Sequence, residues 1–463
     1  MTLRLSLALA LLAVVPAVAQ PAQPQPADDM AEFEKELNAL FSAGGLTSDQ
    51  AAQRASKVSP SVRRSSARIE VAIAQAQAAE LARVPQLGGS LGYTRLSPID
   101  TPVFGDPSTG MAFAFPVFLN QYSAQARASI NLSDYVLRYP KLIAAARLGE
   151  EVARVSNRSS AVNAGQEARV AYYEWVRAKL QTLIAKRQLE QVRTTLRQVR
   201  ALAEVQRLSR ADLMRVESNE AVAEQAAIQL QNLAVLREEQ VRLLIDAPED
   251  QTLTIGEDIR IDITAPGASK LNELLGTAKA QRLDFKVLTT GIEAKEKQRD
   301  AERASLYPRL SAFGQVDYAN PNQRIFPAED KFNLTWAVGA QITWTLNETL
   351  LAKTTDRRLR GETNELRADR DNLERGTRIE LLASQQAVAI AQAALATSAK
   401  GLTAAEEGYR VRRELLNAQR ATAVELVDAE TDLTRARIAA LNARVDLRVA
   451  MVQLAHALGD DVK

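Results

Sequence analysis

Few residues in this chain have the types and spacing that carry chemistry. The single histidine, His456, lies among apolar residues near the C-terminus, which is typical of a seam or surface residue, and the chain has no cysteine. Carboxylates are abundant, but their heptad spacing indicates solvated helix faces and interhelical pairs rather than an acid/base couple. There is no phosphate-binding glycine loop, metal-ligand cluster or nucleophile motif. The sequence therefore predicts no enzyme, no cofactor and no metal site.

One pair of acidic residues could have a function that depends on charge and not on catalysis. Glu425 and Asp428 are three residues apart, so on a helix they share one face about one turn apart. In a trimer they would supply six carboxylates, and rings of acids are how cation-preferring pores are built. Repulsion within such a ring disfavours tight closure of an entrance unless basic residues answer it, and Arg420 and Arg435 are the nearest candidates on the same arm. The alternative is an ordinary solvated helix face.

The acidic pair belongs to a heptad helix. Leucine, with one alanine, recurs every seven residues from Leu426 to Leu454, and alanine follows three places later from Ala429 to Ala457. The preceding arm repeats in the same way. A sustained heptad demands a partner helix, and the small residues let two backbones approach closely.

Helix lengths convert this pattern into an architecture. Long helices, about 100 Å each, are expected at 141–207 and 349–416. Shorter helices, about 55 Å each, are expected at 48–84, 210–246, 268–305 and 421–458. Two short helices stacked end to end match one long helix, so each chain would deliver four columns. Residues 247–267 and both termini would surround the middle of the helical cylinder.

The chain is also an internal repeat. Pro85 and Leu87 match Pro308 and Leu310, and a second set of matches differs in offset only because the intervening turns vary in length. The first unit is predicted at 46–246, with strands at about 86–95 and 122–133 and a helical hairpin at 141–246. The second unit is predicted at 268–463, with strands at about 309–318 and 332–346 and a helical hairpin at 349–458. An equatorial connection, 247–267, joins the two units.

The N-terminus indicates export. A basic residue, the apolar run Leu5–Val15 and the small residues Ala17–Ala19 are typical of a signal peptide, here residues 1–19. A retained anchor is the alternative, although the run is too short to span a bilayer. Residues 20–45 are interpreted as a Pro- and Gln-rich lead followed by a short helix from Met30 to Ser42.

Composition and alternation decide how the chain could enter a membrane. Net charge is only +2, so no strongly basic surface indicates a nucleic-acid partner. No segment after the signal peptide is expected to form an apolar transmembrane helix, which leaves strands. From Leu334 to Leu346 one face is wholly apolar and the other is polar or small. Such alternation over about a dozen residues suits a tilted barrel strand with lipid outside and water within. A soluble sandwich sheet is the alternative.

Aromatic residues and strand number extend this interpretation. Trp336 and Trp344 lie on the apolar face about 26 Å apart along an extended strand, so with Tyr93 and Tyr318 they could mark the membrane interfaces. Four strands cannot close a barrel, and open edges in lipid leave backbone groups unsatisfied. Three chains would give twelve strands and an aqueous lumen. The fold class is therefore mainly α with a membrane β-barrel, built by a homotrimer in outer-membrane lipid.

A family resemblance covers almost the whole mature length. Its carrying residues are Leu46–Ser48, Pro85, Leu87, Tyr307, Pro308, Leu310, Val424–Glu430, Leu454 and Gly459. With the duplicated order of elements, these residues make the chain similar to the TolC-type outer membrane efflux protein family. The resemblance implies a homotrimeric duct that couples to an inner-membrane transporter through a periplasmic adaptor. It also implies that Glu425 and Asp428 line the narrow periplasmic entrance.

The helix tips depart from the family pattern. Where the family usually has Gly-Leu, this chain has Leu208 and Ser209 at the first tip, and Gln419 and Arg420 at the second. The tips are about 100 Å from the strands, so they are expected to dock the adaptor, with Arg207 and Arg420 contributing charge. A solvent-exposed turn without a partner is the alternative.

The predicted function is a passive duct in the cell outer membrane, with its helices in the periplasm. It would export drugs, toxic compounds or proteins that a tripartite efflux or type I secretion system delivers. The competing class is a periplasmic coiled-coil adaptor or scaffold without a pore. The sequence does not name the cargo.

Overall fold

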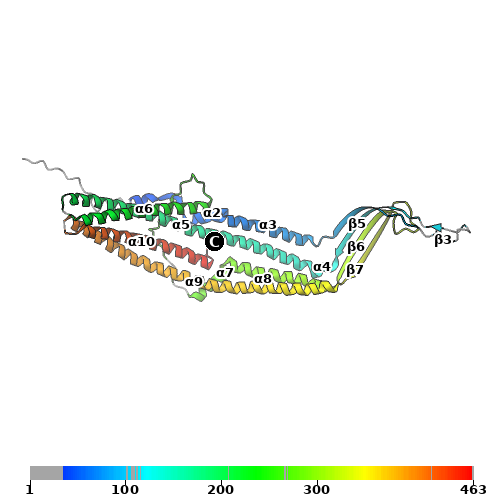
Figure 1. The fold of residues 1–463 in the computed structure, drawn as a ribbon. Helices are drawn as coiled ribbons and strands as arrows, with labels where there is room; N and C mark the ends of the chain where they lie inside the picture. The colour runs from blue at the N-terminus through cyan, green and yellow to red at the C-terminus, as the bar shows by residue number, and fades with distance from the viewer. Residues whose placement is uncertain are drawn as a thin grey trace, which may run out of the picture.

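The protein is a long, slender rod of helices with a sheet at one end (Figure 1). The computed structural model describes residues 35–100, 103–105, 110, 113, 114, 116–206, 208–264, 267, 270–418 and 420–460. The predicted signal peptide, residues 1–19, lies outside the described residues. So do Arg207 and Gln419 at the two helix tips.

The helices form four parallel columns. Their bounds are α2 Ser48–Val58, α3 Pro60–Leu81, α4 Leu132–Leu137, α5 Tyr139–Glu204, α6 Arg210–Ile245, α7 Leu271–Gln281, α8 Leu283–Glu302, the 3₁₀ turn η2 Arg303–Leu306, α9 Leu346–Asn417 and α10 Ala423–Leu458. Helix α5 packs against α3 and α6 on one side and against α8 and α10 on the other, and α9 packs against α8 and α10. The columns therefore run in the order α3/α6, α5, α8/α10, α9, and the first and last are the free edges (Figure 1).

Two of the predicted short helices are interrupted. The helix expected at 48–84 breaks between α2 and α3, where Ser59 is not helical and Pro60 starts the new helix, because proline has no N–H to give to the preceding turn. The helix expected at 268–305 breaks at Arg282, whose ψ is 130°. The Arg282 guanidinium instead donates to Asp284 and Glu380, at 2.7 Å each. The local tertiary partners of Arg282 outweigh its helix propensity.

The sheet contains the four strands that the repeat predicts. They are β2 Gln86–Arg95, β5 Asn120–Asn131, β6 Arg309–Asn320 and β7 Asn333–Thr343, in the order β2-β5-β6-β7 with every pair antiparallel. Strands β5 and β7 end before the predicted 133 and 346, because helical backbone begins at Leu132 and Leu346. A two-stranded ribbon, β3 Val103–Phe104 with β4 Phe113–Ala114, extends beyond the sheet and was not predicted.

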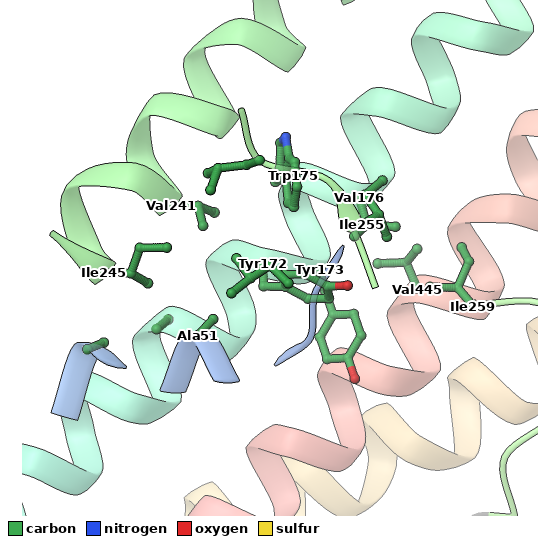
Figure 2. Close-up of a cluster of buried hydrophobic side chains, with 14 of the residues drawn as sticks. Ala51, Tyr172, Tyr173, Trp175, Val176, Val241, Ile245, Ile255, Ile259 and Val445 are labelled. Carbon is green, nitrogen blue, oxygen red and sulfur yellow. The ribbon is translucent and has the colours of Figure 1, made fainter. Parts of the chain in front are cut away.

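The largest core lies at the middle of the rod, where α2, α5, α6 and α10 meet residues 247–264 (Figure 2). Tyr172 and Trp175 of α5 are completely buried, with ring centroids 5.8 Å apart. Ile255 and Ile259 of the connecting segment join them in this core. The middle of the rod, which we call the equator, is therefore packed by residues of a single chain.

The N-terminal helix predicted to reach Ser42 ends earlier. Residues 35–40 are helical, but β1, Phe41–Leu46, follows and bridges Ile255 in parallel. The Leu46 N–H donates to the Thr254 carbonyl at 2.8 Å. A Cβ on Gly45 would lie 2.5 Å from the Ile255 carbonyl carbon. Gly45 therefore permits close contact between the two backbones.

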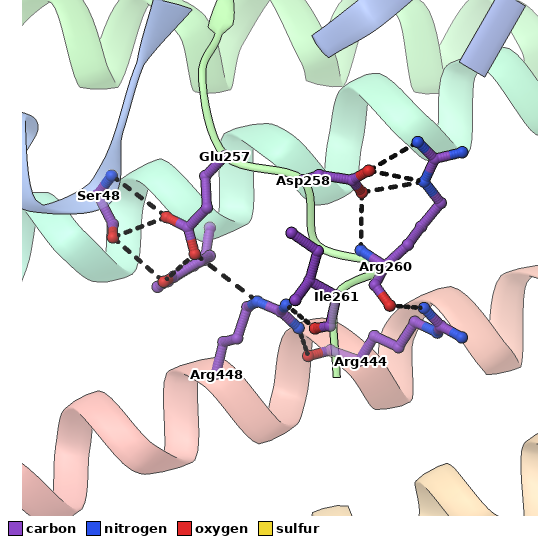
Figure 3. A network of polar contacts seen from close by, with 8 residues as sticks. Ser48, Glu257, Asp258, Arg260, Ile261, Arg444 and Arg448 are labelled. Atoms are coloured by element: carbon purple, nitrogen blue, oxygen red, sulfur yellow. Dashed lines mark hydrogen bonds and ion pairs between the residues drawn. The ribbon is translucent and has the colours of Figure 1, made fainter. Parts of the chain in front are cut away.

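A polar network fastens the connecting segment to the helices (Figure 3). The Ser48 and Tyr173 hydroxyls donate to the two Glu257 carboxylate oxygens at 2.9 and 2.8 Å. Arg448 of α10 is 5% exposed, and it donates to the Ile261 carbonyl at 2.6 Å. Burial raises the pKa of Tyr173 above its ordinary value, so this hydroxyl remains a donor at physiological pH.

One expectation about membrane helices is corrected. Helix α9 contains a stretch that is long and apolar enough to cross a membrane by length and composition alone. The signal is weak, because uncharged Ala, Leu, Val and Ile residues also make a coiled-coil seam. Val388 and Ala391 of α9 pack into a core cluster with Leu447 and Leu454 of α10.

Candidate functional site

The two helix tips are joined by one small core. Helix α5 ends at Glu204 and α6 starts at Arg210, with Ser209 as the N-cap whose hydroxyl accepts from the Asp212 N–H at 3.1 Å. The core beneath the tips comprises Leu196, Val199, Val216, Ala423 and Val427, with Leu208 and Leu213 packed against it. Leu208 of the predicted docking pair thus anchors its tip. A surface hollow at the first tip is lined by Arg200, Ala203, Glu204, Gln206, Leu208, Arg210 and Leu213.

The acidic pair lies against arginines of two other helices. Glu425 accepts from the Arg412 guanidinium of α9 at 3.0 Å, and it also belongs to the capping box that starts α10. Asp428 lies 3.5 Å from the Arg215 guanidinium of α6. All four side chains are about half exposed. The two acids therefore connect α10 to both neighbouring arms of the tip.

Arg435 and Arg420, the arginines that the sequence suggested as partners of the acidic pair, make other contacts. Arg435 pairs with Asp432 at 3.4 Å instead of with the acidic pair. The Arg420 N–H donates to the Leu415 carbonyl at 2.8 Å, which closes the second tip. The actual partners, Arg412 and Arg215, were missed because no spacing within one arm indicates which residue of another helix lies opposite.

A buried carboxyl lies just behind the acidic pair. Glu430 of α10 is 1% exposed, and one of its oxygens accepts from the Thr195 hydroxyl of α5 at 2.7 Å. Its other oxygen is buried without a hydrogen-bond partner among the described residues. Burial raises the pKa of Glu430 to about 7, against the lowering effects of Thr195 and of Arg413 on α9. Glu430 was not predicted to be buried, because its place in the heptad resembles that of a solvated acid.

The apolar face of the sheet is open. Leu91, Val338 and Ile342 are 88%, 77% and 74% exposed. The register places alternate residues of all four strands on this face, for example Leu91, Ala124, Tyr318 and Leu334 in one row. A contiguous apolar patch of this kind marks a surface that another phase or molecule covers.

Aromatic residues gather at the outer end of this face. The ring centroids of Tyr93 and Tyr122 lie 5.1 Å apart, and Phe332 lies 6.1 Å from Tyr122 and 5.1 Å from Tyr318. The structure thus brings the predicted Tyr93 and Tyr318 together in one cluster. Tyr122 and Phe332 were not predicted to join this cluster, because their proximity depends on the register between strands.

The two tryptophans lie below this cluster. Trp336 is 69% exposed and follows the Leu334 row by two residues, while Trp344 is 56% exposed just past the end of β7. The Leu334 row and Trp344 are about 33 Å apart along the strand. In a barrel strand tilted by about 40°, this length would correspond to a height of about 25 Å, which is the height of an apolar barrel band, whereas the spacing of the two tryptophans would correspond to only about 20 Å. The cluster and Trp344 would therefore bracket such a band more fully than the two tryptophans.

The acidic residues and the single histidine are the side chains that could bind a metal ion. Within the part of the chain that the structure describes, no group of His, Asp and Glu could hold a metal ion. His456 is half-buried near the end of α10, beside a small hollow that Arg282 and Asp284 also line.

Comparisons with known proteins identify the fold. No protein-family model matches the chain, and no curated protein matches it. The Campylobacter jejuni CmeC outer membrane channel aligns with TM-score 0.73 and 14% identity over 98% of this chain and 94% of that one. The outer membrane protein VceC from Vibrio cholerae gives 0.72 and 16% over 94% and 99%. The open-state Neisseria gonorrhoeae MtrE outer membrane channel gives 0.73 and 18% over 90% and 89%. The chain therefore has the fold of these outer-membrane channel structures, with mainly helical structure and a four-stranded antiparallel sheet.

Proposed function

We propose that three copies of this chain build a passive duct across the outer membrane, as a β-barrel continued by an α-helical tunnel. The observation that carries this proposal is the sheet, whose apolar face is exposed while its other face is polar or small except for Phe313. Water does not favour such a face, but a bilayer does. The sheet contains four strands, which are too few to close alone.

The edges of the sheet support closure by copies of the same chain. Strands β2 and β7 are the edges, and because the pairs alternate in direction, β2 and β7 run antiparallel to each other. Strand β7 of one copy can therefore pair with β2 of the next without breaking the antiparallel pattern. Three copies give twelve strands and leave no open edge in lipid.

The helical edges support the same assembly. The edge columns are α3/α6 and α9, which continue into the sheet edges β2 and β7. Several large apolar side chains on α6 and α9 are more than half exposed in the single chain: Val222, Val235, Leu243, Ile379 and Ile390. A neighbouring copy would bury such residues in a coiled-coil seam.

The tips would face the periplasm and dock an adaptor. They lie at the far end of the rod from the sheet (Figure 1), and α5 alone extends about 100 Å. This docking end would include Leu208, Ser209 and Arg420. It would also include Arg207 and Gln419, which lie outside the described residues. An inner-membrane transporter behind the adaptor would select the cargo, which we assign to small toxic compounds or secreted proteins.

The acidic pair would form the periplasmic entrance. In three copies, Glu425 and Asp428 contribute six carboxylates near the tips. Their pairs with Arg412 and Arg215 connect α10 to α9 and α6. We infer that these ion pairs hold the entrance closed, and that the acids favour cations when the pairs separate.

Fractionation and conductance of the wild-type protein test this function. We expect the chain in the outer membrane, without its first 19 residues, as a trimer whose gel mobility changes on heating. The purified trimer should conduct in planar bilayers. A monomeric periplasmic pool without conductance would contradict the duct. It would favour the scaffold class, which leaves the open sheet unexplained.

A further inference from the structure

One aromatic residue interrupts the polar face of the sheet. Among the described residues of the four long strands, the face opposite the lipid-type face contains Ser, Thr, Asn, Gln, Gly, Ala, two arginines, one aspartate and Phe313. Phe313 of β6 is half-buried although its face should meet water. An aromatic side chain in this position needs a specific reason.

The Phe313 ring lies over a glycine of the neighbouring strand. Phe313 and Gly339 of β7 are register partners. A Cβ on Gly339 would lie 2.9 Å from the ring. Any other residue at 339 would push the ring away, so the glycine allows it to lie against the sheet. One side of the ring is therefore covered by backbone.

Arg127 of β5 covers the ring from its other neighbour strand. Its guanidinium carbon lies 5.5 Å from the Phe313 centroid, within the range of a cation–π contact. Arg127 is exposed, and its register partner is Gln315. Asp317 is on the same face two residues further along β6, and its carboxylate accepts from the Gln315 side-chain amide at 3.0 Å. Among the described residues, no ion pair joins Asp317 to Arg127. The guanidinium thus rests on the ring rather than on the nearest acid.

We propose that Arg127, held on Phe313, is a specificity-determining contact in the lumen for anionic cargo with a flat aromatic face. The inference rests on the proposed duct, in which the polar face lines the lumen and three copies supply three such pairs. A guanidinium binds anions through its N–H groups and stacks on aromatic rings. The lumen-facing side of Arg127 can therefore take a planar anion while Phe313 keeps the side chain in place.

Single-channel recordings with a planar aromatic probe test this contact. Naphthalene-1,5-disulfonate, added to reconstituted wild-type trimers, should block the current. R127Q should raise the concentration for half-block by about three-fold, the scale of one exposed cation–π contact, and should shift the reversal potential toward cations. F313L should weaken the block while leaving the preference between K⁺ and Cl⁻ unchanged.

D317N is the matched control on the same face. It removes one charge per chain, as R127Q does, but it should shift the reversal potential toward anions without weakening the block. R127K should keep the ion preference and lose part of the block. If R127Q conducts, selects and is blocked like the wild type, the inference is wrong and the duct stands. If the wild-type protein forms no pores at all, the proposed function fails and the inference fails with it.

Discussion

Two tryptophans show how differently this chain treats its middle and its end. Trp175 at the equator is completely buried by residues of its own chain, whereas Trp336 in the sheet is 69% exposed. The equator is sealed by the 247–264 segment and the Glu257 network, and the sheet is left with two open edges and an open apolar face. The equator is therefore packed within one copy, while in the proposed duct the sheet would acquire its stability from lipid and from neighbouring copies.

The largest effect is expected from charge on the open face of the sheet. V338R places an arginine in the middle of the apolar face, at a cost of about 2–4 kcal/mol per copy in a bilayer, which amounts to about 6–12 kcal/mol for a trimer. Outer-membrane trimers should be lost. Q341R, on the polar face of the same strand, should assemble normally. Heat-modifiable bands in membrane fractions compare the two, and equal assembly would contradict a lipid-facing Val338.

The second effect concerns the equator. W175A removes a completely buried indole and should lower the free energy of unfolding by about 3–5 kcal/mol. W336A removes an exposed indole of the same size and should leave thermal unfolding of the helical rod unchanged. Thermal scans of both variants measure the difference. Equal losses would mean that the two regions are not distinct.

Sequence patterns predicted the elements of this fold much better than their partners. Strand-like runs and the internal repeat placed β2, β5, β6 and β7, and the helical patterns placed α5, α6, α9 and α10 within a few residues, because each pattern lies within one segment. The break at Arg282 was missed because it depends on Glu380, which is distant in sequence. The strand at Gly45 was missed for the same reason, since Ile255 lies opposite it.

The candidate site shows the same limit. Sequence spacing selected Glu425 and Asp428, and resemblance gave them a role. The contacts with Arg412 and Arg215, and the burial of Glu430 against Thr195, follow from how α10 packs on three other helices. Phe313 could have been noticed, because it is the aromatic exception in an alternating strand.

The third effect is a pH dependence at the tip core. Burial raises the pKa of Glu430 from 4.5 to about 7. The folded state therefore holds its proton to a higher pH than the unfolded chain, so the free energy of unfolding falls as pH rises between these values and stays low above them. E430Q cannot ionise, and at pH 8 it should be more stable than the wild type by up to about 3 kcal/mol.

Hydrogen exchange in the first turns of α10 measures this effect locally. Wild-type protection should decrease from pH 5 to pH 8 after correction for the intrinsic exchange rate, while E430Q protection should stay constant. E425Q, which changes an exposed acid on the same helix, is the control and should retain the wild-type dependence. A wild-type profile in E430Q would show that Glu430 does not titrate in this range.

The smallest effect is expected at the entrance. The Arg412–Glu425 and Arg215–Asp428 pairs are about half exposed, so each contributes only about 0–1 kcal/mol. E425A/D428A should still assemble, and it should reduce cation selectivity and the block by multivalent cations added from the periplasmic side. Single-channel recordings measure both. If this variant conducts and selects as the wild type does, the entrance lies elsewhere.

Disulfide trapping between the sheet edges tests the central claim most directly, and the natural chain is free of cysteine. Within one chain β2 and β7 are about 14 Å apart across two strands, too far for a disulfide. Ser90→Cys on β2 should therefore be combined in turn with Thr335→Cys, Ala337→Cys or Gln341→Cys on the same face of β7. One of these pairs should yield a covalent trimer on oxidation, whereas Ser90→Cys with Val338→Cys on the opposite face should not. If all three same-face pairs remain uncross-linked in membranes, β7 does not pair with β2 of a neighbouring copy, and the trimeric duct is contradicted.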